Sequence, residues 1–476
     1  MKLSSLIKTG GIASAAYLLY VMSFSLFPYF AKKDLNSVFK RDIDNYDFYS
    51  DKPCVDRVAL VEEPGISLAV RVKMISEATK TLDIAYYSLN MGKTTDYFLA
   101  AVLDAAERGV KVRILLDGIF NGFSNDYKYL AAALGSHTNI ELKLYNTLNP
   151  LKPWKFNGRM HDKYIIIDNK LLLLGGRNIG DKYFDPDGYD KNLSIDRDVL
   201  IFNTEYKNKA KESSLFQVRN YMNSVWESKR TKLSFTKSCK KSNVQKAHLI
   251  KLMKEIREKY DYFFSEKIDY FSNTFSSNKI TFFANDIDIY KKEPKVSYII
   301  RHLLLKAKDK VFLQSPYVVL TENIETALRE IGQKNVDYEI LTNSMQSSPN
   351  LPAYSLYLND RDKILKMNAQ IYEFQNTNAI HAKTFIIDNR MSIVGSFNMD
   401  PRSEYIDTEI MLAIDSTPFT EYLQKITDMY KSNSLVVGFD GKYIENSDVI
   451  EFAASPQKRL MFKIIGKIIS PLRTLV

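Results

Sequence analysis

Cysteine and histidine are scarce in this sequence. The 476 residues include two cysteines, Cys54 and Cys239, and five histidines. The two cysteines lie too far apart for metal-type spacing, and they imply no disulfide framework. No HExxH stretch, cysteine cluster or carboxylate cluster is present, so nothing in the sequence indicates a metal site. We therefore expect a chemistry that uses neither a metal nor any other cofactor.

Charged residues are absent from residues 9–31, TGGIASAAYLLYVMSFSLFPYFA. As a helix, this run is long enough to cross a hydrocarbon core about 30 Å thick. The run lacks a good small-x-small cleavage site at its end, which favours an uncleaved single-pass anchor over a signal peptide. We expect a membrane protein whose residues 1–44 form this anchor and a connector. The side of the membrane that the rest of the chain faces stays open.

Acidic residues are outnumbered by basic ones, 56 against 66, which gives a net charge of +10. This balance favours an anionic partner, either nucleic acid or an acidic membrane surface. Residues 229–259 hold eleven Lys and Arg but two Glu, and they fit either a solvated linker helix or a surface for acidic headgroups. In residues 460–469, apolar side chains follow helical spacing with Lys463 and Lys467 on another face. That pattern suits a basic amphipathic helix in a membrane interface, or a helix docked on the body.

A β-α-β unit occurs twice along the chain. TLDIAYYSLN, TDYFLAAVLDAAERGV and KVRILLD read as strand, helix and strand, and KVFLQSPYVV, ENIETALREIGQK and VDYEILTNS repeat that order. The repetition indicates an internal duplication, and the β-α-β order indicates α/β domains with a largely parallel, helix-covered sheet. The expected division is an anchor and connector (1–44), a first domain (45–228), a basic linker (229–270), a second domain (271–450) and a C-terminal basic amphipathic helix (451–476).

A motif built on histidine is also repeated. GRMHDKYIIIDNKLLLLGGRNIG begins at residue 158, and AIHAKTFIIDNRMSIVGSFNMD begins at residue 379. Both read H-x-K, four residues, D, six residues, G-[GS]-x-N. Because histidine is rare here, two matches in the same register are very unlikely to arise by chance. The matched residues are His161, Lys163, Asp168 and Asn178 in the first copy, and His381, Lys383, Asp388 and Asn398 in the second.

The spacing of the motif suits a strand. Residues i and i+2 of a strand point to the same face, so each histidine projects with its lysine. If the halves pack about a pseudo-twofold axis through these strands, two imidazoles, two ammonium groups and two Asn amides converge. Such a pocket fits a tetrahedral anion, with the lysines and the amides binding the phosphoryl oxygens. One imidazole can attack phosphorus while the other protonates the leaving oxygen.

The paired motif resembles that of the phospholipase D superfamily. The resemblance covers both halves, and NGRMHDK, LLGGRNIGDKYF, DRDVLIFNTE and GSFNMDPRSEYIDTEIML are most similar to bacterial cardiolipin synthases and their phospholipase D-like relatives. It implies two duplicated phospholipase D-type α-β-α sandwich domains that share one active site at their interface. It also implies a covalent phosphohistidine intermediate that forms without metal, with His161 as nucleophile and His381 as general acid and base.

The resemblance further implies an acid downstream of each motif that orients a histidine. Alignment of IDRDVLI with IDTEIML nominates Asp198 and Glu409, and leaves Asp196 and Asp407 as alternatives at parallel positions. Asp168 and Asp388 belong to the catalytic motif of the family. Their place at a strand end suggests a structural role.

The function that this resemblance implies is that of a membrane-anchored phosphatidyltransferase. We expect it to make cardiolipin from phosphatidylglycerol. The alternatives are hydrolysis to phosphatidic acid, an endonuclease of the same superfamily, and a non-catalytic membrane-remodelling protein. The anchor and the basic C-terminal segment favour lipid over nucleic acid, and the two intact motifs favour catalysis.

Overall fold

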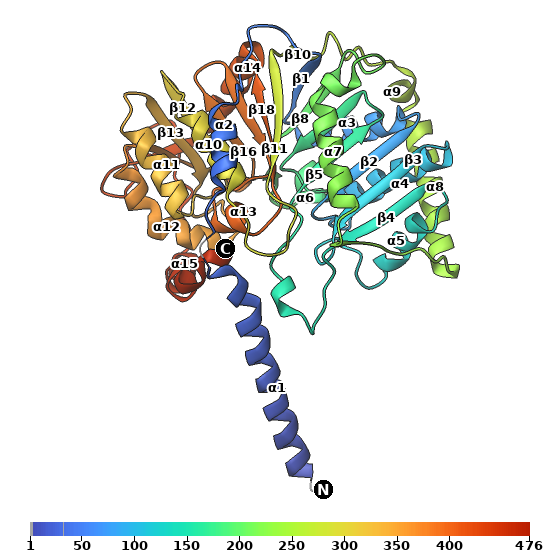
Figure 1. Cartoon of the computed structure of the whole chain (residues 1–476), viewed down its shortest axis with the longest axis horizontal. Coiled ribbons are helices and arrows are strands. Elements are labelled where there is room, and N and C mark those ends of the chain that lie inside the picture. Colours follow the sequence, from blue (N-terminus) through green and yellow to red (C-terminus); the bar gives the residue numbers. More distant parts are fainter. Residues whose placement is uncertain (1–2, 32) are drawn as a thin grey trace.

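The computed structural model describes residues 3–31 and 33–476. Residues 1, 2 and 32, which belong to the expected anchor and connector, lie outside the described residues. A two-part α/β body carries a long N-terminal helix that projects away from it (Figure 1). This helix, α1 (Leu3–Leu26), continues into a 3₁₀ turn, η1 (Phe27–Tyr29).

Each half of the body is built on one mixed sheet, and the two sheets have the same strand order apart from β10 (Phe275–Ser276), an extra edge strand of the first sheet. The first sheet runs β10, β1 (Asp56–Val61), β8 (Asp198–Asn203), β6 (Leu171–Gly175), β5 (Lys163–Ile167), β2 (Thr81–Tyr86), β3 (Lys111–Asp117), β4 (Ile140–Tyr145) and β9 (Thr231–Leu233). The second runs β11 (Lys279–Ala284), β18 (Ile410–Asp415), β17 (Met391–Gly395), β16 (Lys383–Ile387), β12 (Lys310–Gln314), β13 (Asp337–Asn343), β14 (Gln370–Phe374) and β19 (Ser434–Val437). The duplication is therefore confirmed.

The prediction of a largely parallel sheet was wrong in one respect. Within these two sheets as described, only β2, β3 and β4, and their counterparts β12, β13 and β14, are parallel to one another. The motif strands are antiparallel, because each turns back on itself after its aspartate to form the hairpins β5–β6 and β16–β17. The sequence signal for parallel pairing came from the β-α-β unit and does not extend to these hairpins.

Helices cover both faces of each sheet. The helices of the first half are α3 (Pro64–Ser76), α4 (Lys93–Glu107), α5 (Tyr127–Gly135), α6 (Asp181–Phe184), α7 (Ser214–Trp226), α8 (Lys240–Lys259) and α9 (Asp261–Ser265). Those of the second are α10 (Lys295–Leu304), α11 (Glu322–Gly332), α12 (Leu351–Leu365), α13 (Pro401–Tyr405) and α14 (Thr417–Lys431). Two further helices, α2 (Ser37–Asp44) and α15 (Pro456–Ile469), lie against the second half.

Three hydrophobic clusters hold the body together. One lies under the outer helices of the first sheet, and a second lies under those of the second sheet. The third joins the two halves, because it contains Tyr164 and Ile166 from β5 together with Ile386 from β16 and Leu412 from β18. The two sheets therefore pack into one shared core, with α7 and α14 contributing to it.

The segment expected to be a basic linker is part of the first half. Its residues 231–233 form the edge strand β9, and α8 packs on α4 and α5 through the buried Leu249 and Met253. Leu249 and Met253 are four residues apart, so they lie on one face of the helix and leave the lysines on the others. The alternation of lysine with buried aliphatic residues is that of an amphipathic surface helix, not of a linker.

The C-terminal helix α15 docks on the body, which is one of the two interpretations that the sequence left open, and its place in a membrane interface stays a prediction. It docks on α12 through Phe462, which is buried, and its ring lies 5.1 Å from that of Tyr354. A separate stripe on the helix remains exposed. That stripe contains Leu460, Met461, Ile464 and Ile468.

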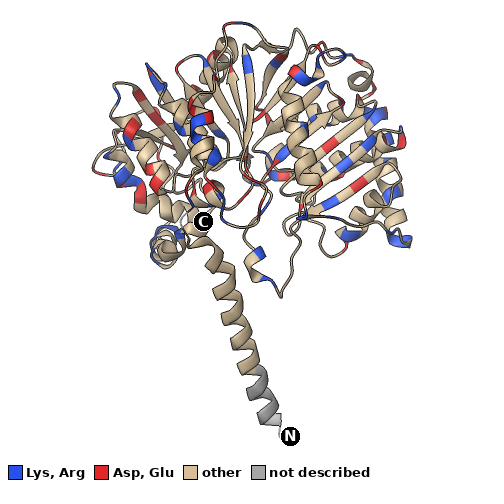
Figure 2. Cartoon of the chain, viewed as in Figure 1, with Lys and Arg blue, Asp and Glu red and all other residues tan. Residues whose placement is uncertain are grey.

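The N-terminal helix is the one candidate membrane span among residues 3–31 and 33–476. Gly11–Tyr29 has a mean hydropathy of 1.4, and of its residues only Tyr29 is buried in the body. Figure 2 shows no charged residue along the tan part of this helix, whereas charges of both signs are spread over the body. In length and composition, this helix resembles a membrane span.

Candidate active site

The two motif histidines stand immediately before the buried strands β5 and β16. All five residues of each strand are buried, which fixes the strands between their neighbours. Each lysine turns back to its own histidine, with Lys163 Nζ donating to the His161 carbonyl and Lys383 Nζ donating to the His381 carbonyl. Lys383 Nζ also lies 2.9 Å from His381 Nδ1. The H-x-K pairs therefore project together, as the strand spacing predicted.

The backbone before each histidine pairs with the opposite half. Met160 forms a bridge with Thr408, and the His161 amide donates to Thr408 Oγ1. In the other half, β15 (Ala379–Ile380) pairs with β7 (Ser194–Ile195), and the His381 amide donates to the Ile195 carbonyl. These two crossings carry each histidine to an acid of the other half.

The acid that contacts His161 is Glu409, as nominated. His161 Nδ1 lies 3.0 Å from Glu409 Oε1. The Glu409 carboxyl also accepts hydrogen bonds from the hydroxyls of Ser396 and Ser403. Glu409 is fully buried, so this contact is enclosed by protein.

The nomination of Asp198 as the acid at His381 is not supported by the geometry. His381 Nδ1 lies 2.5 Å from Asp196 Oδ2, so the alternative residue makes the contact. Asp198 instead forms buried ion pairs with Arg71, at 2.9 Å, and with Arg177, at 3.1 Å. Asp198 begins β8 opposite Gly175, a register that directs it to the arginines of its own half.

Asp407, the other alternative, also has a structural partner. Its carboxylate pairs with Arg402 at 2.8 Å and accepts a hydrogen bond from the Arg159 amide. These contacts tie α13 to the segment before His161. Asp407 therefore supports the backbone of the site.

Asp168 and Asp388 do not reach the reacting groups, although they belong to the motif. Asp168 lies seven residues beyond His161, or about 20 Å along an extended chain. Its carboxylate accepts hydrogen bonds from the amides of residues 79–81, and Asp388 does the same for residues 308–310. Both residues have positive φ, 50° and 52°, which the hairpin turn requires. We therefore correct their assignment from catalytic to structural.

The two motif asparagines occupy matching buried positions. Asn178 and Asn398 are 6% and 8% exposed, and the Oδ1 atom of each has no hydrogen-bond partner among the described residues. Asn178 Nδ2 donates weakly to the Tyr183 hydroxyl at 3.3 Å. A buried amide with an unused polar atom is costly unless a ligand or water completes it. The unpartnered atom is an acceptor, which a phosphoryl oxygen cannot satisfy, so phosphate binding would use the Nδ2 donors, and that role stays a proposal.

Two tyrosines that the sequence did not single out face the histidines. The Tyr87 ring lies 5.0 Å from the His161 ring, and the Tyr183 ring lies 5.9 Å from the His381 ring, both edge to face. A cavity of about 420 Å³ opens beside His381, with Tyr183 and Tyr317 in its wall. The only sequence signal was position, since Tyr87 directly follows β2 and Tyr183 lies five residues after Asn178.

Burial and nearby charge lower the pKa values of both histidines and both lysines. Burial, aided by the neighbouring lysine, lowers the pKa of His381 to about 4 and holds that of His161 well below its ordinary value. Burial also lowers the pKa of Lys163 to about 7 and of Lys383 to about 8. Both imidazoles are therefore neutral near pH 7, the form in which an imidazole nitrogen can accept a proton or attack phosphorus.

The two acids shift in opposite directions. Burial raises the pKa of Glu409 to about 8, so it is largely protonated near pH 7. Burial alone would raise the pKa of Asp196 as well, but Lys383 and His381 outweigh it and hold that pKa below its usual range. His381 therefore has an ionised carboxylate beside it, whereas His161 has a mostly neutral one.

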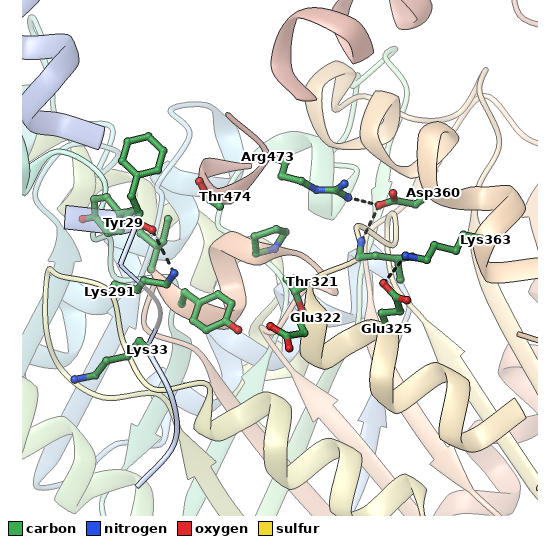
Figure 3. A pocket seen from close by; sticks show the side chains of 15 residues that line it. Tyr29, Lys33, Lys291, Thr321, Glu322, Glu325, Asp360, Lys363, Arg473 and Thr474 are labelled. Carbon is green, nitrogen blue, oxygen red and sulfur yellow. Dashed lines mark hydrogen bonds and ion pairs between the residues drawn. The ribbon is translucent and has the colours of Figure 1, made fainter. Parts of the chain in front are cut away.

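A second cavity lies between the segment that follows α1 and the C-terminal segment (Figure 3). It has a volume of about 460 Å³, and its wall includes Tyr29 and Phe30 after α1 and Arg473 and Thr474 near the C-terminus. Its charged side chains are largely paired, as Figure 3 shows for Arg473 with Asp360 and Lys363 with Glu325. Neither histidine lines it, so we do not assign the reaction to this cavity.

No group of three or more His, Cys, Asp or Glu residues is arranged to hold a metal ion within residues 3–31 and 33–476. The positive charge at the site comes from Lys163 and Lys383. Cys54 and Cys239 are both free thiols.

The chain is similar to proteins of phospholipid metabolism. Residues 72–212 and 300–430 match the protein family described as "Cardiolipin synthase, PLD-like domain". Cardiolipin synthase C of Escherichia coli (strain K12) is 27% identical over 405 residues, which cover 75% of this chain and 81% of that protein. An uncharacterized protein of Helicobacter pylori (strain J99) is 31% identical over 398 residues, with 76% of each chain covered.

A solved structure shares the whole two-part fold. The crystal structure of phosphatidylserine synthase from Haemophilus influenzae Rd KW20 superposes with a TM-score of 0.63 at 14% sequence identity. The superposition covers 93% of this chain and 100% of that one. At this level of identity, the likeness establishes the architecture.

Proposed function

This chain belongs to the cardiolipin synthase family of phospholipase D-like proteins, and on that premise we propose that it is a membrane-anchored phosphatidyltransferase. The donor is phosphatidylglycerol, the acceptor is the free hydroxyl of a second phosphatidylglycerol, and the products are cardiolipin and glycerol. The observation that carries the proposal is the convergence of two H-x-K pairs, one from each half, on acids of the opposite half.

The chemistry follows from the two different environments. His161 Nδ1–H donates to Glu409, which leaves the lone pair on Nε2 free to attack phosphorus. A phosphorus–nitrogen bond forms and the bond to the glycerol oxygen breaks. His381 is neutral near pH 7, so it must first take up a proton; ionised Asp196 and the bound phosphodiester stabilise the imidazolium, which then gives this proton to the leaving oxygen. The pocket charge needed by the phosphoryl oxygens comes from Lys163, Lys383 and the amides of Asn178 and Asn398.

The second half of the reaction reverses these roles. The acceptor hydroxyl gives its proton to neutral His381, and its oxygen attacks phosphorus as the bond to His161 breaks. Water in place of the lipid hydroxyl would release phosphatidic acid by the same steps. Pocket shape and water exclusion decide between the two acceptors.

Two features outside the site support a lipid substrate. The apolar helix α1 would hold the body at a bilayer, and the exposed stripe of α15 would lie in its interface. Lys463 and Lys467 flank that stripe and would attract anionic lipid by about 1 kcal/mol each. Phosphatidylglycerol is anionic and carries the free hydroxyl that an acceptor needs.

The test is a substrate comparison with purified full-length protein. Labelled phosphatidylglycerol in mixed micelles should yield cardiolipin and free glycerol, and the yield should survive excess EDTA. Phosphatidic acid as the sole product would reduce the enzyme to a hydrolase. Cleavage of single- or double-stranded DNA with inert lipid would replace the substrate class, and inertness toward both would favour a non-catalytic role.

A further inference from the structure

A loop of the first half runs along α1 instead of over the body. This loop, residues 147–157, follows β4, and we call it the α1 loop. The Tyr17 hydroxyl donates to the Pro150 carbonyl at 3.0 Å, and the Tyr20 hydroxyl donates to the Leu151 carbonyl at 2.9 Å. Figure 1 shows the loop hanging below the body on the side from which α1 projects.

Closer to the body, the α1 loop continues to follow the helix. The Trp154 ring lies 6.5 Å from the Phe24 ring, edge to face. Asn157 Nδ2 donates to the Ser25 carbonyl at 2.8 Å. The loop therefore contacts α1 over residues 17–25, which lie inside the candidate span Gly11–Tyr29.

The α1 loop has the properties of a segment in contact with lipid. Leu148 and Leu151 are 55% and 74% exposed, although both are fully apolar. The carbonyls of residues 150 and 151 take hydrogen bonds from the α1 tyrosines, and irregular backbone can enter an apolar phase only when such groups are satisfied. Lys152 and Trp154, next along the loop, are residue types that gather at membrane interfaces.

The contacts also set a depth along the helix. Tyr29 is 1% exposed and its hydroxyl donates to the Ile289 carbonyl, so the helix enters the body there. Tyr20 lies nine residues earlier, about 14 Å along a helix that rises 1.5 Å per residue. The stretch of α1 nearest the body is therefore covered on one side by the α1 loop.

The amphipathic helix α15 lies on the same side of the body. In Figure 1 it is seen end-on, whereas α1 is seen from its side. A bilayer crossed by α1 would thus meet α15 lying flat, with its exposed Leu460, Ile464 and Ile468 available to lipid. Three segments far apart in sequence therefore share one face.

We propose that the α1 loop is a membrane-inserted wedge. Leu148 and Leu151 enter the lipid, Trp154 lies at the headgroup level beside Phe24, and the interface crosses α1 between Phe24 and Tyr29. The occupant is a lipid bilayer, because the surface is continuous with the apolar helix and carries interfacial residue types. This inference rests on the membrane anchorage in the proposed function, but not on the reaction.

Tryptophan fluorescence tests the wedge directly, since the chain has two tryptophans. Trp226 is 7% exposed in the body, so the variant Trp226→Phe leaves Trp154 as the reporter. The full-length variant is placed in bilayers of phosphatidylcholine and phosphatidylglycerol that carry bromine high or low on the acyl chains. We expect strong quenching that is greater with the high bromines. The absence of quenching, or stronger quenching by the low bromines, would overturn the proposal.

Matched leucine variants test the contribution of the loop tip. Leu148→Asn/Leu151→Asn should lower turnover of bilayer lipid by about threefold through lost apolar insertion. Turnover of short-chain lipid in micelles should stay unchanged. Leu233→Asn, on the edge strand β9 and 53% exposed, is the control and should change neither rate. Equal losses in the test and control variants would contradict the wedge.

The two proposals fail in different ways. A catalytically active protein with unquenched Trp154 would remove the wedge and leave the function. An inactive protein with quenched Trp154 would remove the function and leave the wedge. A dimer that dissociates in the leucine variant, with Trp154 unquenched, would assign the surface to a second copy of the chain and overturn the lipid assignment.

Discussion

The two halves of the molecule share one strand order but use non-equivalent acids at their histidines. Glu409 contacts His161 from the position that corresponds to Asp198, whereas Asp196 contacts His381 from the position that corresponds to Asp407. A duplicated scaffold therefore supports an asymmetric site. Two histidines with matching sequence motifs can differ in chemistry because their partners come from the other half.

The residues around each acid explain the asymmetry. Asp198 is held by Arg71 and Arg177, and the counterpart of Arg177 in the second half is Phe397. Without an arginine at that position, Glu409 is free to extend toward His161. Breaking a buried ion pair costs about 3–5 kcal/mol, so the arginines hold Asp198 away from the site.

The small residue of each motif adds to the difference. A Cβ atom on Gly176 would lie 2.4 Å from Asp196 Oδ1, so only glycine allows Asp196 its present position. The counterpart, Ser396, uses its hydroxyl to donate to Glu409. One half needs the absence of a side chain where the other half uses one.

Loss of either histidine should have the largest effect. Because each half supplies one essential group to a shared site, His161→Asn and His381→Asn should each lower kcat by about 10³-fold or more. Steady-state cardiolipin formation measures this, with circular dichroism as the control for folding. Substantial activity in either variant would show that one half works alone.

Replacing the four acids one at a time should distinguish those that contact a histidine from those that only occupy the equivalent sequence position. Asp196→Asn and Glu409→Gln remove a charge or proton site from an imidazole contact, and kcat should fall by about 10²-fold. Asp198→Asn and Asp407→Asn are the matched controls, which should keep most of their activity per folded molecule. Asp198→Asn should instead lower the free energy of unfolding by about 3–5 kcal/mol. A large loss of kcat in the two controls, with little loss in Asp196→Asn and Glu409→Gln, would mean that Asp198 and Asp407 are the acids that act on the histidines.

Replacing Gly176 or Ser396 should lower kcat less than replacing the acids does. Gly176→Ser should displace Asp196 from His381 and lower kcat by about 30-fold, because the added Cβ overlaps the carboxylate. Ser396→Gly removes one donor to Glu409 and should cost less. Comparable kcat values for the two variants would contradict the steric requirement. A pH–rate profile should show that Gly176→Ser also alters the ionisation assigned to His381.

The smallest expected effect is on substrate binding at alkaline pH. A lysine is charged below its pKa, and the pKa values of Lys163 and Lys383 are about 7 and about 8 because of burial. Their charge is present at pH 6 and is lost as pH rises through these values. KM for phosphatidylglycerol should therefore rise by about fivefold between pH 6 and pH 9. A constant KM over this range would indicate that the lysines do not bind the phosphoryl group.

The repeated motif made the fold and the location of the site predictable, whereas the partners across the interface were not. His161, Lys163, His381 and Lys383 could be placed together because strand periodicity is local and the repeat supplied the symmetry. Which acid meets which histidine depends on how the halves cross, and spacing within one half contains no such information. The same limit hid Tyr87, which contacts His161 only through the fold.

The linker prediction failed for a related reason. The charge of residues 229–270 suggested a solvated connector, but Leu249 and Met253 bury one face of α8 against α4 and α5. Composition averaged over a segment conceals a narrow apolar stripe. The same consideration applies to α15, in which a buried Phe462 and an exposed apolar stripe share one short helix.

Trapping the covalent intermediate tests the central claim, that the two halves form one site in which the histidines have different roles. Full-length protein is mixed with phosphatidylglycerol labelled at phosphorus and quenched rapidly, and the labelled peptide is mapped. The label should be on His161. In His381→Asn, the label should accumulate when the substrate carries a leaving group that needs no protonation, because this variant cannot take the proton from the acceptor hydroxyl. Label on both histidines, or on neither during turnover, would contradict the account.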